Sequence, residues 1–271
     1  MEFYGLIGEK LSHSLSPQIH KRVFELLNIE GAYKLFEIPK TRINNLGESL
    51  KVLGIKGVNV TIPYKQTVME QLDFLSDEAK KIGAVNTILL KDDKLYGYNS
   101  DYYGFGSLLK VNNIEVNNKV AVVLGNGGAA KALITYLLDN NVKKLYLVTR
   151  DKSKKIDVTK DVELIDYNDL EKISGDILVN TTPVGMYPNM GKSPVSEEVI
   201  SKFNDIVDII YNPEETEFLR LGKKLNKKTC GGLYMLVGQA IKSEEIWQDK
   251  VIDKHIIDTI YNEIAKEFKI V

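Results

Sequence analysis

The feature that most constrains this chain is an apolar segment that runs directly into a glycine-rich turn. Residues 120–124 form a continuous apolar run, which is typical of a strand buried on both faces of a parallel sheet. Gly125, Gly127 and Ala130 then fit the spacing G-x-G-x-x-G/A, and apolar residues at helical spacing follow. The glycines permit a tight turn and close approach to a pyrophosphate, which the helix start also favours. We therefore predict a Rossmann-like dinucleotide site, with a plain glycine-rich turn as the alternative.

Composition narrows the class of protein. The chain has 271 residues, enough for two domains, and its 36 basic and 37 acidic residues give a formal net charge of −1. We therefore expect neither a nucleic acid nor a membrane as a partner. Cys230 is the only cysteine, so no intrachain disulfide is possible. With no signal peptide or membrane-spanning run in view, we expect a cytoplasmic protein.

Strand and helix patterns alternate along both halves of the chain. In the first half we expect strands at 3–8, 33–38, 57–62 and 83–90, a hairpin through 92–93 into 94–98, and helices from 17, around 43–53 and from 63. In the second half we expect strands at 120–124, 144–148, 162–165, 176–180 and 206–211, and helices at 101–109, 217–225 and 233–246. The connection 150–161 is charged and poor in apolar residues, so a full crossover helix there is doubtful.

These patterns predict an α/β fold of two domains. Residues 1–100 would form an N-terminal α/β substrate domain, and 101–238 a Rossmann-like dinucleotide-binding domain. Isoleucines at 252, 256, 260 and 264 predict an amphipathic helix, so we expect 239–271 to return to the first domain. The ligand cleft is then expected between the domains.

Four polar clusters lie at expected strand ends or helix starts in the first half, where ligands bind in α/β sheets. They are Ser14/Ser16, Asn59/Thr61/Lys65, Asn86/Thr87 and Asn99/Asp101. Hydroxyls, amides, one amine and one carboxylate suit a polyhydroxylated acid better than an apolar ligand. Each residue also has a plain structural reading: Ser16 or Asp101 as a helix N-cap, and Lys65 as a solvated lysine in the first turn of a helix that Pro63 begins.

Seven motifs in matching order make the sequence resemble the shikimate dehydrogenase family across nearly its whole length. They are His13-Ser-Leu-Ser-Pro17, Asn59-Val-Thr-Ile-Pro-Tyr-Lys65, Gly83-Ala-Val-Asn-Thr87, Asn99-Ser-Asp101, Gly125-Asn-Gly-Gly-Ala129, Asn180-Thr-Thr-Pro-Val-Gly-Met186 and Gly232-Leu-Tyr-Met-Leu-Val-Gly-Gln239. The resemblance implies reversible NADPH-dependent reduction of 3-dehydroshikimate to shikimate, in the pathway to chorismate and the aromatic amino acids.

The resemblance also implies roles for individual residues. Lys65 and Asp101 match the proton-transferring pair. Substrate-binding positions match Ser14, Ser16, Asn59, Thr61, Asn86, Asp101, Tyr211 and Gln239. Cofactor-binding positions match Asp77, Gly125, Asn126, Gly127, Gly128, Ala129, Thr149, Arg150, Ile209, Gly232 and Met235. Asp77 has an equally good reading as a first-turn acid after Ser76, and His13 reads as a structural partner. No metal is expected.

The end of the second strand of the nucleotide-binding half indicates the cofactor. An NAD site has an acidic residue there, whereas Thr149-Arg150 favours the 2′-phosphate of NADP. Asp151 departs from the family's usual threonine, which leaves NAD open. Three hypotheses remain: an NADP-dependent shikimate dehydrogenase, a relative that also acts on quinate with NAD or NADP, and a non-catalytic sensor of cofactor or shikimate. We expect small-molecule ligands and a monomer or homodimer.

Overall fold

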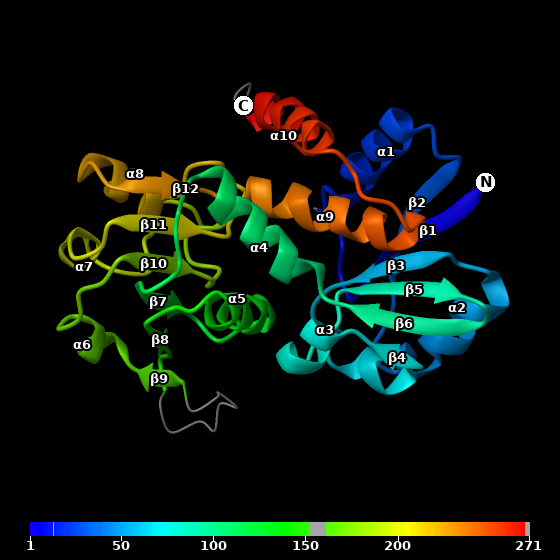
Figure 1. Ribbon diagram of the computed structural model, residues 1–271, viewed down its shortest axis with the longest axis horizontal. Coiled ribbons are helices and arrows are strands. Elements are labelled where there is room, and N and C mark those ends of the chain that lie inside the picture. The colour runs from blue at the N-terminus through cyan, green and yellow to red at the C-terminus, as the bar shows by residue number, and fades with distance from the viewer. Residues whose placement is uncertain (13, 152–160, 269–271) are drawn as a thin grey trace. The chain divides into compact units, whose positions relative to one another are not determined.

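The structure is a computed structural model that describes residues 1–12, 14–151 and 161–268 (Figure 1). The chain divides into two compact units. Unit 1 comprises Met1–Gly104 and Val237–Ile264, and unit 2 comprises Phe105–Leu236 and the residues from Ala265 onward. Each unit contains one sheet of six strands. The predicted fold class is confirmed: both units are α/β, and the chain comes back to unit 1 near its end.

Unit 1 has a mixed sheet in the order β2-β1-β3-β5-β6-β4. Its strands are β1 Glu2–Gly8, β2 Gly31–Glu37, β3 Gly57–Val60, β4 Phe74–Leu75, β5 Thr87–Lys91 and β6 Lys94–Tyr98. Its helices are α1 Ser16–Leu27, η1 Ile43–Asn45, α2 Leu46–Leu53, η2 Thr67–Gln71 and α3 Asp77–Ile82. The unit boundaries fall inside α4 Ser100–Val111 and α9 Leu233–Gln248, and α10 spans Lys254–Phe268. Strands β1, β2 and β3 run parallel, whereas β5 runs antiparallel to β3 and β6.

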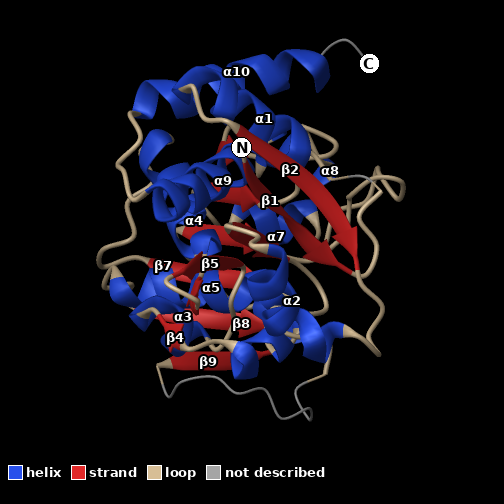
Figure 2. Ribbon diagram, turned by 90° about the vertical axis from the view of Figure 1, so that its right-hand side faces the viewer, coloured by secondary structure: helices blue, strands red, loops and turns tan. Residues whose placement is uncertain are grey.

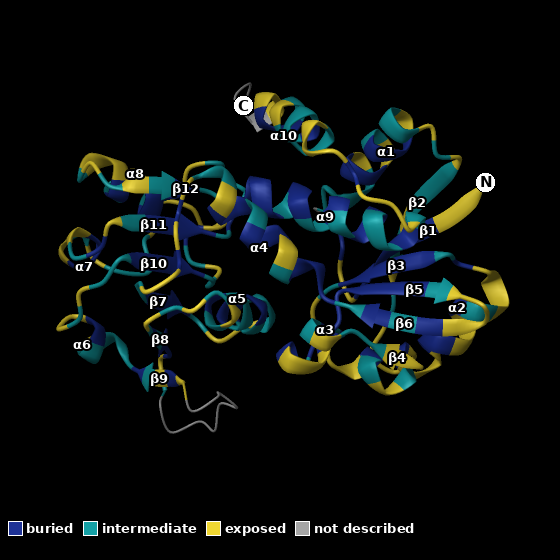
Figure 3. Cartoon of the chain, viewed as in Figure 1, coloured by how far each residue is buried: buried dark blue, intermediate teal, exposed yellow. Residues whose placement is uncertain are grey.

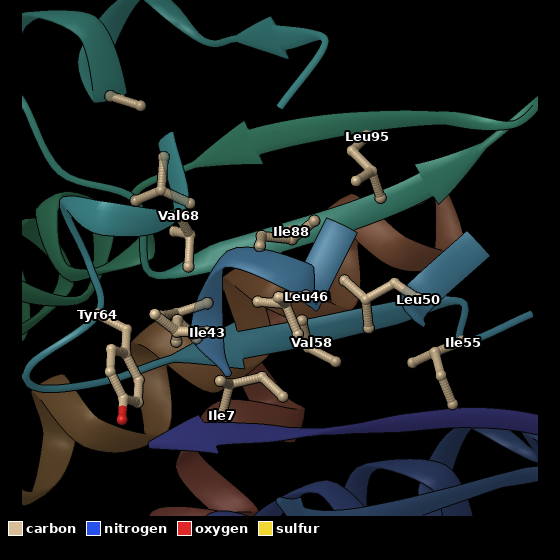
Figure 4. Packing of buried hydrophobic residues seen from close by; sticks show 13 residues of the cluster. Ile7, Ile43, Leu46, Leu50, Ile55, Val58, Tyr64, Val68, Ile88 and Leu95 are labelled. Carbon is tan, nitrogen blue, oxygen red and sulfur yellow. The ribbon is translucent and has the colours of Figure 1, made fainter. Parts of the chain in front are cut away.

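Alternate residues of the strands build a separate core on each face of the sheet of unit 1. Ile7 and Val58 face a cluster formed with η1, α2 and η2, which Figure 4 shows at close range. Tyr4 of β1 points to the opposite face and packs with Phe24 of α1 and Trp247 of α9. Helix α10 lies against α1 (Figure 2), where Arg22 donates to the Glu263 carboxylate at 2.7 and 2.9 Å. The sheet is therefore covered on both faces, as its apolar strands require.

Unit 2 has a fully parallel sheet in the order β12-β11-β10-β7-β8-β9. Its strands are β7 Val120–Leu124, β8 Lys144–Val148, β9 Val162–Ile165, β10 Ile177–Asn180, β11 Asp205–Asp208 and β12 Lys228–Cys230. Its helices are α5 Gly128–Asp139, α6 Tyr167–Leu170, α7 Glu197–Ser201 and α8 Glu217–Lys224. The central strands β7 and β10 are almost wholly buried (Figure 3), which agrees with their continuous apolar sequences.

The helix predicted from Pro63 is wrong. Residues 63–66 form a turn, and only a 3₁₀ helix follows at Thr67–Gln71. The carbonyl of Lys65 accepts the N–H of Val85 at 2.8 Å, so it is committed to a neighbouring segment. The strand predicted from residue 83 is also shorter and begins at Thr87, since Gly83 ends α3 at φ +66°.

Smaller corrections concern the ends of elements. Leu15 is the N-cap residue of α1 and Ser16 its first helical residue, so the predicted cap at Ser16 is wrong. Strand β11 stops at Asp208 rather than at residue 211, because the Asp208 carboxylate takes the N–H of Ile210 at 3.1 Å. The predicted hairpin is confirmed: Asp92 and Asp93 have φ of 51° and 59°, which suits a two-residue turn between β5 and β6. The doubtful crossover at 150–161 lies mostly outside the described residues.

Gly57 tests how tightly the Trp247 face of unit 1 is packed. A Cβ at Gly57 would collide with the indole of Trp247, whose Nε1 donates to the carbonyl of Ile88 at 2.9 Å. We expect Gly57→Ala to lower the free energy of unfolding by about 1–3 kcal/mol, because the buried indole has no room to move. Chemical denaturation measures this. Val52→Ala on exposed α2 is the control, with an expected change within about 0.5 kcal/mol. Equal effects of the two substitutions would contradict the prediction.

Candidate functional site

Unit 1 contains a largely buried lysine–aspartate ion pair. Lys65 Nζ donates to Asp101 Oδ2 at 2.5 Å, and the two side chains are only 15% and 7% exposed. Lys65 lies in the turn after β3, and Asp101 lies in the first turn of α4. These segments are 36 residues apart in the chain, yet they place an amine and a carboxylate in direct contact. The structure thus joins the two residues that the sequence predicts as a proton-transferring pair.

A buried polar cluster extends through the same unit. The Asn59 amide nitrogen lies 2.8 Å from Ser243 Oγ and 3.2 Å from Thr87 Oγ1. The Asn86 Oδ1 accepts the Ser100 N–H at 2.6 Å, while its amide donates to Gln239 Oε1 at 3.3 Å. Three of the predicted substrate residues, namely Asn59, Asn86 and Gln239, therefore belong to one hydrogen-bonded group. A satisfied buried network of this kind fixes the orientation of its amides.

The antiparallel strand β5 explains how this cluster forms. Asn59 lies on β3, and Thr87 lies opposite it at the start of β5 in the strand register. Because β5 runs against β3, its first residues lie beside the carboxyl-terminal part of β3. Thr61 follows β3 at this same end, and its N–H bonds to the carbonyl of Ile7 at 2.9 Å. Three of the four polar clusters that are separate in sequence, those of Asn59, Asn86 and Asp101, therefore meet at one edge of the sheet.

Ser14 and Ser16 form a small hydroxyl pair before α1. Ser14 Oγ donates to Ser16 Oγ at 3.1 Å and accepts the Ser16 N–H at 3.2 Å. Ser14 therefore satisfies one of the free N–H groups at the start of α1, the task that the sequence assigns to Ser16. The two hydroxyls lie at the N-terminus of a 12-residue helix, which is a favourable environment for a carboxylate.

The glycine turn of unit 2 has the geometry that the sequence predicts. Gly125 has φ +93°, and a Cβ there would come within 2.7 Å of the Thr182 side chain. Gly127 is the N-cap of α5, and a Cβ on it would meet nothing within 4 Å. Asn126 and Gly127 are exposed, and Gly128 and Ala129 begin the 12-residue helix. The turn thus leaves its backbone and a helix N-terminus open to a pyrophosphate, so these residues fit a dinucleotide.

Two further predicted cofactor residues are in contact with each other. A Cβ on Gly232 would overlap the carbonyl of Ile209, and the Gly232 N–H donates to the carbonyl of Ile210 at 2.9 Å. Met235 is buried in the first turn of α9, and Tyr211 is half-buried after β11. Thr149 is buried at the end of β8, whereas Arg150 beside it is exposed. An exposed guanidinium at the end of the second strand is available to a phosphate.

Asp77 is the one predicted cofactor residue that belongs to unit 1. Its carboxylate is 96% exposed in the first turn of α3, 3.7 Å from Lys80, and Ser76 caps the helix by accepting the Ala79 N–H at 3.4 Å. This geometry matches the reading of a first-turn acid, so its cofactor role stays a prediction. His13 lies outside the described residues. In the described part of the chain, no group of three or more His, Cys, Asp or Glu could hold a metal ion.

Asp208 is a buried residue that the sequence analysis missed. Its carboxylate accepts the Thr216 hydroxyl at 2.7 Å, the Asn180 amide at 3.1 Å and the N–H of Ile210. The carboxylate thus ties the end of β10 and the start of α8 to the turn that holds Ile209 and Tyr211. The only sequence signal was an acid that interrupts the apolar run 206–210. Tyr33, Ser100 and Ser243 were missed as well, and for Ser243 the sole hint was its spacing of four from Gln239.

Burial controls the titration of Asp208. Desolvation outweighs the three donors and raises the pKa of Asp208 to about 6, from 3.8. The folded state therefore binds a proton more tightly than the unfolded chain between about pH 4 and 6, and stability from this group falls as the pH rises through that window. We compare the free energy of unfolding of wild type with that of Asp208→Asn. The difference, wild type minus variant, should fall by at most about 3 kcal/mol as the pH rises from 4 to 7.

Denaturant unfolding of both proteins across that range measures the difference, with Asp249→Asn at a highly exposed carboxylate as the control. A difference between wild type and Asp208→Asn that does not change with pH would contradict the assignment to Asp208.

A parallel sheet with an open glycine turn, joined to a second α/β unit that carries buried amides and a lysine–aspartate pair, defines a two-domain nucleotide-binding α/β protein. Comparison with known proteins gives the family. A family model described as the shikimate dehydrogenase substrate binding domain matches residues 6–88. A shikimate dehydrogenase (NADP(+)) of Clostridium beijerinckii is 62% identical over 270 residues, covering 99% of this chain and 100% of the relative.

Solved structures agree with this result. Shikimate dehydrogenase 1 from Peptoclostridium difficile has a TM-score of 0.92 and 62% identity, with 99% of both chains covered. Shikimate 5-dehydrogenase from Thermus thermophilus, in complex with NADP(H) and shikimate, has a TM-score of 0.87 and 30% identity, with 97% of this chain and 99% of that chain covered. The chain belongs to the shikimate dehydrogenase family. In the part of the chain that the structure describes, no helix is long and apolar enough to cross a membrane.

Proposed function

We propose that this chain is an NADP-dependent shikimate dehydrogenase, which reversibly reduces 3-dehydroshikimate to shikimate in the pathway to chorismate and the aromatic amino acids. The observation that carries the proposal is the buried Lys65–Asp101 pair in the unit that also holds the amide cluster. The family's relatives carry the same activity in their names. The small-molecule ligands are the sugar-like acid and the dinucleotide, and we extend the proposal to a cytoplasmic monomer or homodimer.

In the proposal, residues of different chemistry bind different parts of the substrate and the cofactor. In the proposal, Ser14 and Ser16 bind the substrate carboxylate with hydroxyls at the start of α1, where the helix dipole favours an anion. Asn59, Thr61, Asn86 and Gln239 bind ring hydroxyls, and Tyr211 of unit 2 also binds the substrate. NADP(H) binds to the predicted cofactor residues of unit 2, namely Gly125 to Ala129, Thr149, Arg150, Ile209, Gly232 and Met235. Asp77 also contributes to cofactor binding in the proposal.

The chemical step needs one proton for each hydride. NADP(H), when bound, supplies the hydride in reduction and accepts it in oxidation. In the direction of reduction, the Lys65–Asp101 pair gives a proton to the carbonyl oxygen, which becomes the hydroxyl of shikimate. In the direction of oxidation, the pair takes that proton back. Serine, threonine and asparagine cannot do this near neutral pH, whereas an amine and a carboxylate can.

Replacing the lysine tests the chemical step. We expect Lys65→Ala or Lys65→Met to lower kcat by about 10²–10⁴, the usual value of a positioned acid or base. The Kd of shikimate should change much less, because the hydroxyls and amides remain. Asp101→Asn should also lower kcat. The activation free energy of the double variant should rise by less than the sum of the increases in the two single variants, because the pair acts as a unit.

Steady-state kinetics and calorimetry measure these quantities. Lys91→Ala, at an exposed lysine of unit 1 that pairs with Asp249, is the matched control and should leave kcat unchanged. A Lys65→Ala enzyme with near-normal kcat and a raised KM would make Lys65 a binding residue instead. Assays of wild type with quinate and with NAD separate the proposal from the quinate-active alternative, and wild type that binds shikimate without turnover would favour the sensor.

Replacing Arg150 tests the choice between NADP and NAD. We expect Arg150→Ala to raise the KM for NADP by about 10- to 100-fold, because one charge-assisted hydrogen bond to a phosphate contributes about 1.5–3 kcal/mol. The KM for NAD should change little, since NAD has no 2′-phosphate. Arg220→Ala removes an exposed arginine of the same unit, one bound to Glu217, and is the control. Equal effects of Arg150→Ala on both cofactors would exclude the 2′-phosphate role.

A further inference from the structure

Tyr33 lies next to the buried amide cluster, and no role in the reaction has been assigned to it so far. It lies on β2, one of the two edge strands of the sheet of unit 1. Its hydroxyl donates to Asn59 Oδ1 at 2.8 Å. Burial raises the pKa of Tyr33 well above its ordinary value, so the hydroxyl remains a donor at every pH of interest. The phenol thus contacts a residue that we propose to bind substrate, Asn59.

The hydrogen bonds of Asn59 show what this contact does. The amide nitrogen has two hydrogens and three acceptors near it: Ser243 Oγ at 2.8 Å, Thr87 Oγ1 at 3.2 Å and the Asn86 carbonyl at 3.3 Å. Both hydrogens are therefore used within the protein. The amide oxygen has two lone pairs, and among the described residues its one recorded donor is Tyr33. The remaining capacity of Asn59 is one lone pair on Oδ1, which can accept from a hydroxyl but cannot donate to a carbonyl.

The Tyr33 ring packs against a buried histidine–glutamate pair. It stacks on the His20 imidazole, with ring centroids 4.1 Å apart and planes 6° apart. His20 Nδ1 lies 2.6 Å from Glu244 Oε1, and these two side chains are 1% and 0% exposed. Glu244 Oε2 accepts from Gln248 at 3.2 Å, which fixes the carboxylate on α9. A fully buried ionisable pair is costly unless its geometry is well satisfied, so this contact restrains the ring that rests on it.

We propose that Tyr33 is a positioning residue for substrate binding. Its hydroxyl holds the Asn59 amide so that Oδ1 keeps one lone pair for a hydroxyl of the substrate. The His20–Glu244 pair holds the Tyr33 ring in the plane that this hydrogen bond needs. Asn59 then distinguishes a hydroxyl from a carbonyl at the ring position that it contacts. The inference rests on the proposed function, because it takes shikimate to be the ligand.

The test removes the hydroxyl and keeps the ring. Tyr33→Phe preserves the stack on His20 but leaves Asn59 Oδ1 without its protein donor. We expect the Kd and the KM of shikimate to rise by about 5- to 30-fold, while the Kd of NADP stays within about twofold. The value of kcat should fall much less than KM rises. Tyr96→Phe is the matched control, because it removes a phenol hydroxyl from the same unit on a ring that stacks on Phe74 instead.

Two coupled variants separate positioning from general packing. Tyr33→Phe should have little further effect on shikimate binding in an Asn59→Ala background, because its effect passes through that amide. Glu244→Gln should raise the shikimate Kd in wild type by more than it does in Tyr33→Phe. Melting temperatures of all variants show whether each still folds, and Tyr33→Phe should melt only a few degrees below wild type, because one buried hydrogen bond is lost while the ring packing is unchanged.

The outcomes are distinguishable. Unchanged shikimate affinity in folded Tyr33→Phe, with wild type active, overturns the positioning role and leaves the proposed function intact. An equal loss of affinity for shikimate and NADP would also overturn the role, because it would indicate a general change in structure. Wild type that neither binds nor turns over shikimate would instead overturn the proposed function itself.

Discussion

A polar group buried among apolar strands must find a hydrogen-bond partner, and this requirement determines how the substrate half of the molecule is built. Among buried side-chain nitrogen and oxygen atoms in the described residues, only Asn99 Oδ1 has no hydrogen-bond partner. Ser243 meets the requirement for Asn59 and Thr87, and Ser100 does so for Asn86. Ser243 lies on α9 and Ser100 is the first residue of α4, so the same bonds that satisfy the core also tie these two helices to Asn59 of β3, to Asn86 and to Thr87 of β5. The amides are thereby oriented before any ligand binds, which reduces the side-chain entropy that is lost on binding.

In the nucleotide-binding unit, close backbone contact takes the place of a polar cluster. Gly232 has no side chain, and for that reason the chain can pass directly against the carbonyl of Ile209. Gly125 adopts φ +93° in a turn that β-carbon sterics would otherwise disfavour. Asp208 then ties the Ile209 turn to Asn180 and to the cap residue Thr216 of α8. The turn that carries Ile209, which we propose to contact the cofactor, is therefore held by one carboxylate, and burial of that carboxylate explains why its pKa is raised.

The sequence predicted those features whose cause is local. The apolar run 120–124 and its glycines predicted strand, turn and helix correctly, and Asp92-Asp93 predicted the hairpin. The helix at Pro63 was wrong because a hydrogen bond to Val85, 20 residues away in sequence, outweighed the local preference. Tyr33 and Ser243 could not be found from pattern alone. Their partner Asn59 lies 26 and 184 residues away, and periodicity indicates which face a residue occupies without indicating what it touches.

The chemistry of the proposed site explains why its charges are arranged as they are. Shikimate carries a carboxylate, and an unpaired lysine near it would form an ion pair with the substrate rather than serve the reacting oxygen. The proposed carboxylate site offers hydroxyls and a helix N-terminus instead of a cation, so it binds the anion without competing for Lys65. The carboxylate of Asp101 lies 2.5 Å from the Lys65 amine, and its opposite charge offsets the cost of burying that amine. A proton can then pass to or from the substrate oxygen while the carboxylate of the substrate remains bound elsewhere. The Ser14–Ser16 hydroxyl pair and the Lys65–Asp101 ion pair therefore separate anion binding from proton transfer.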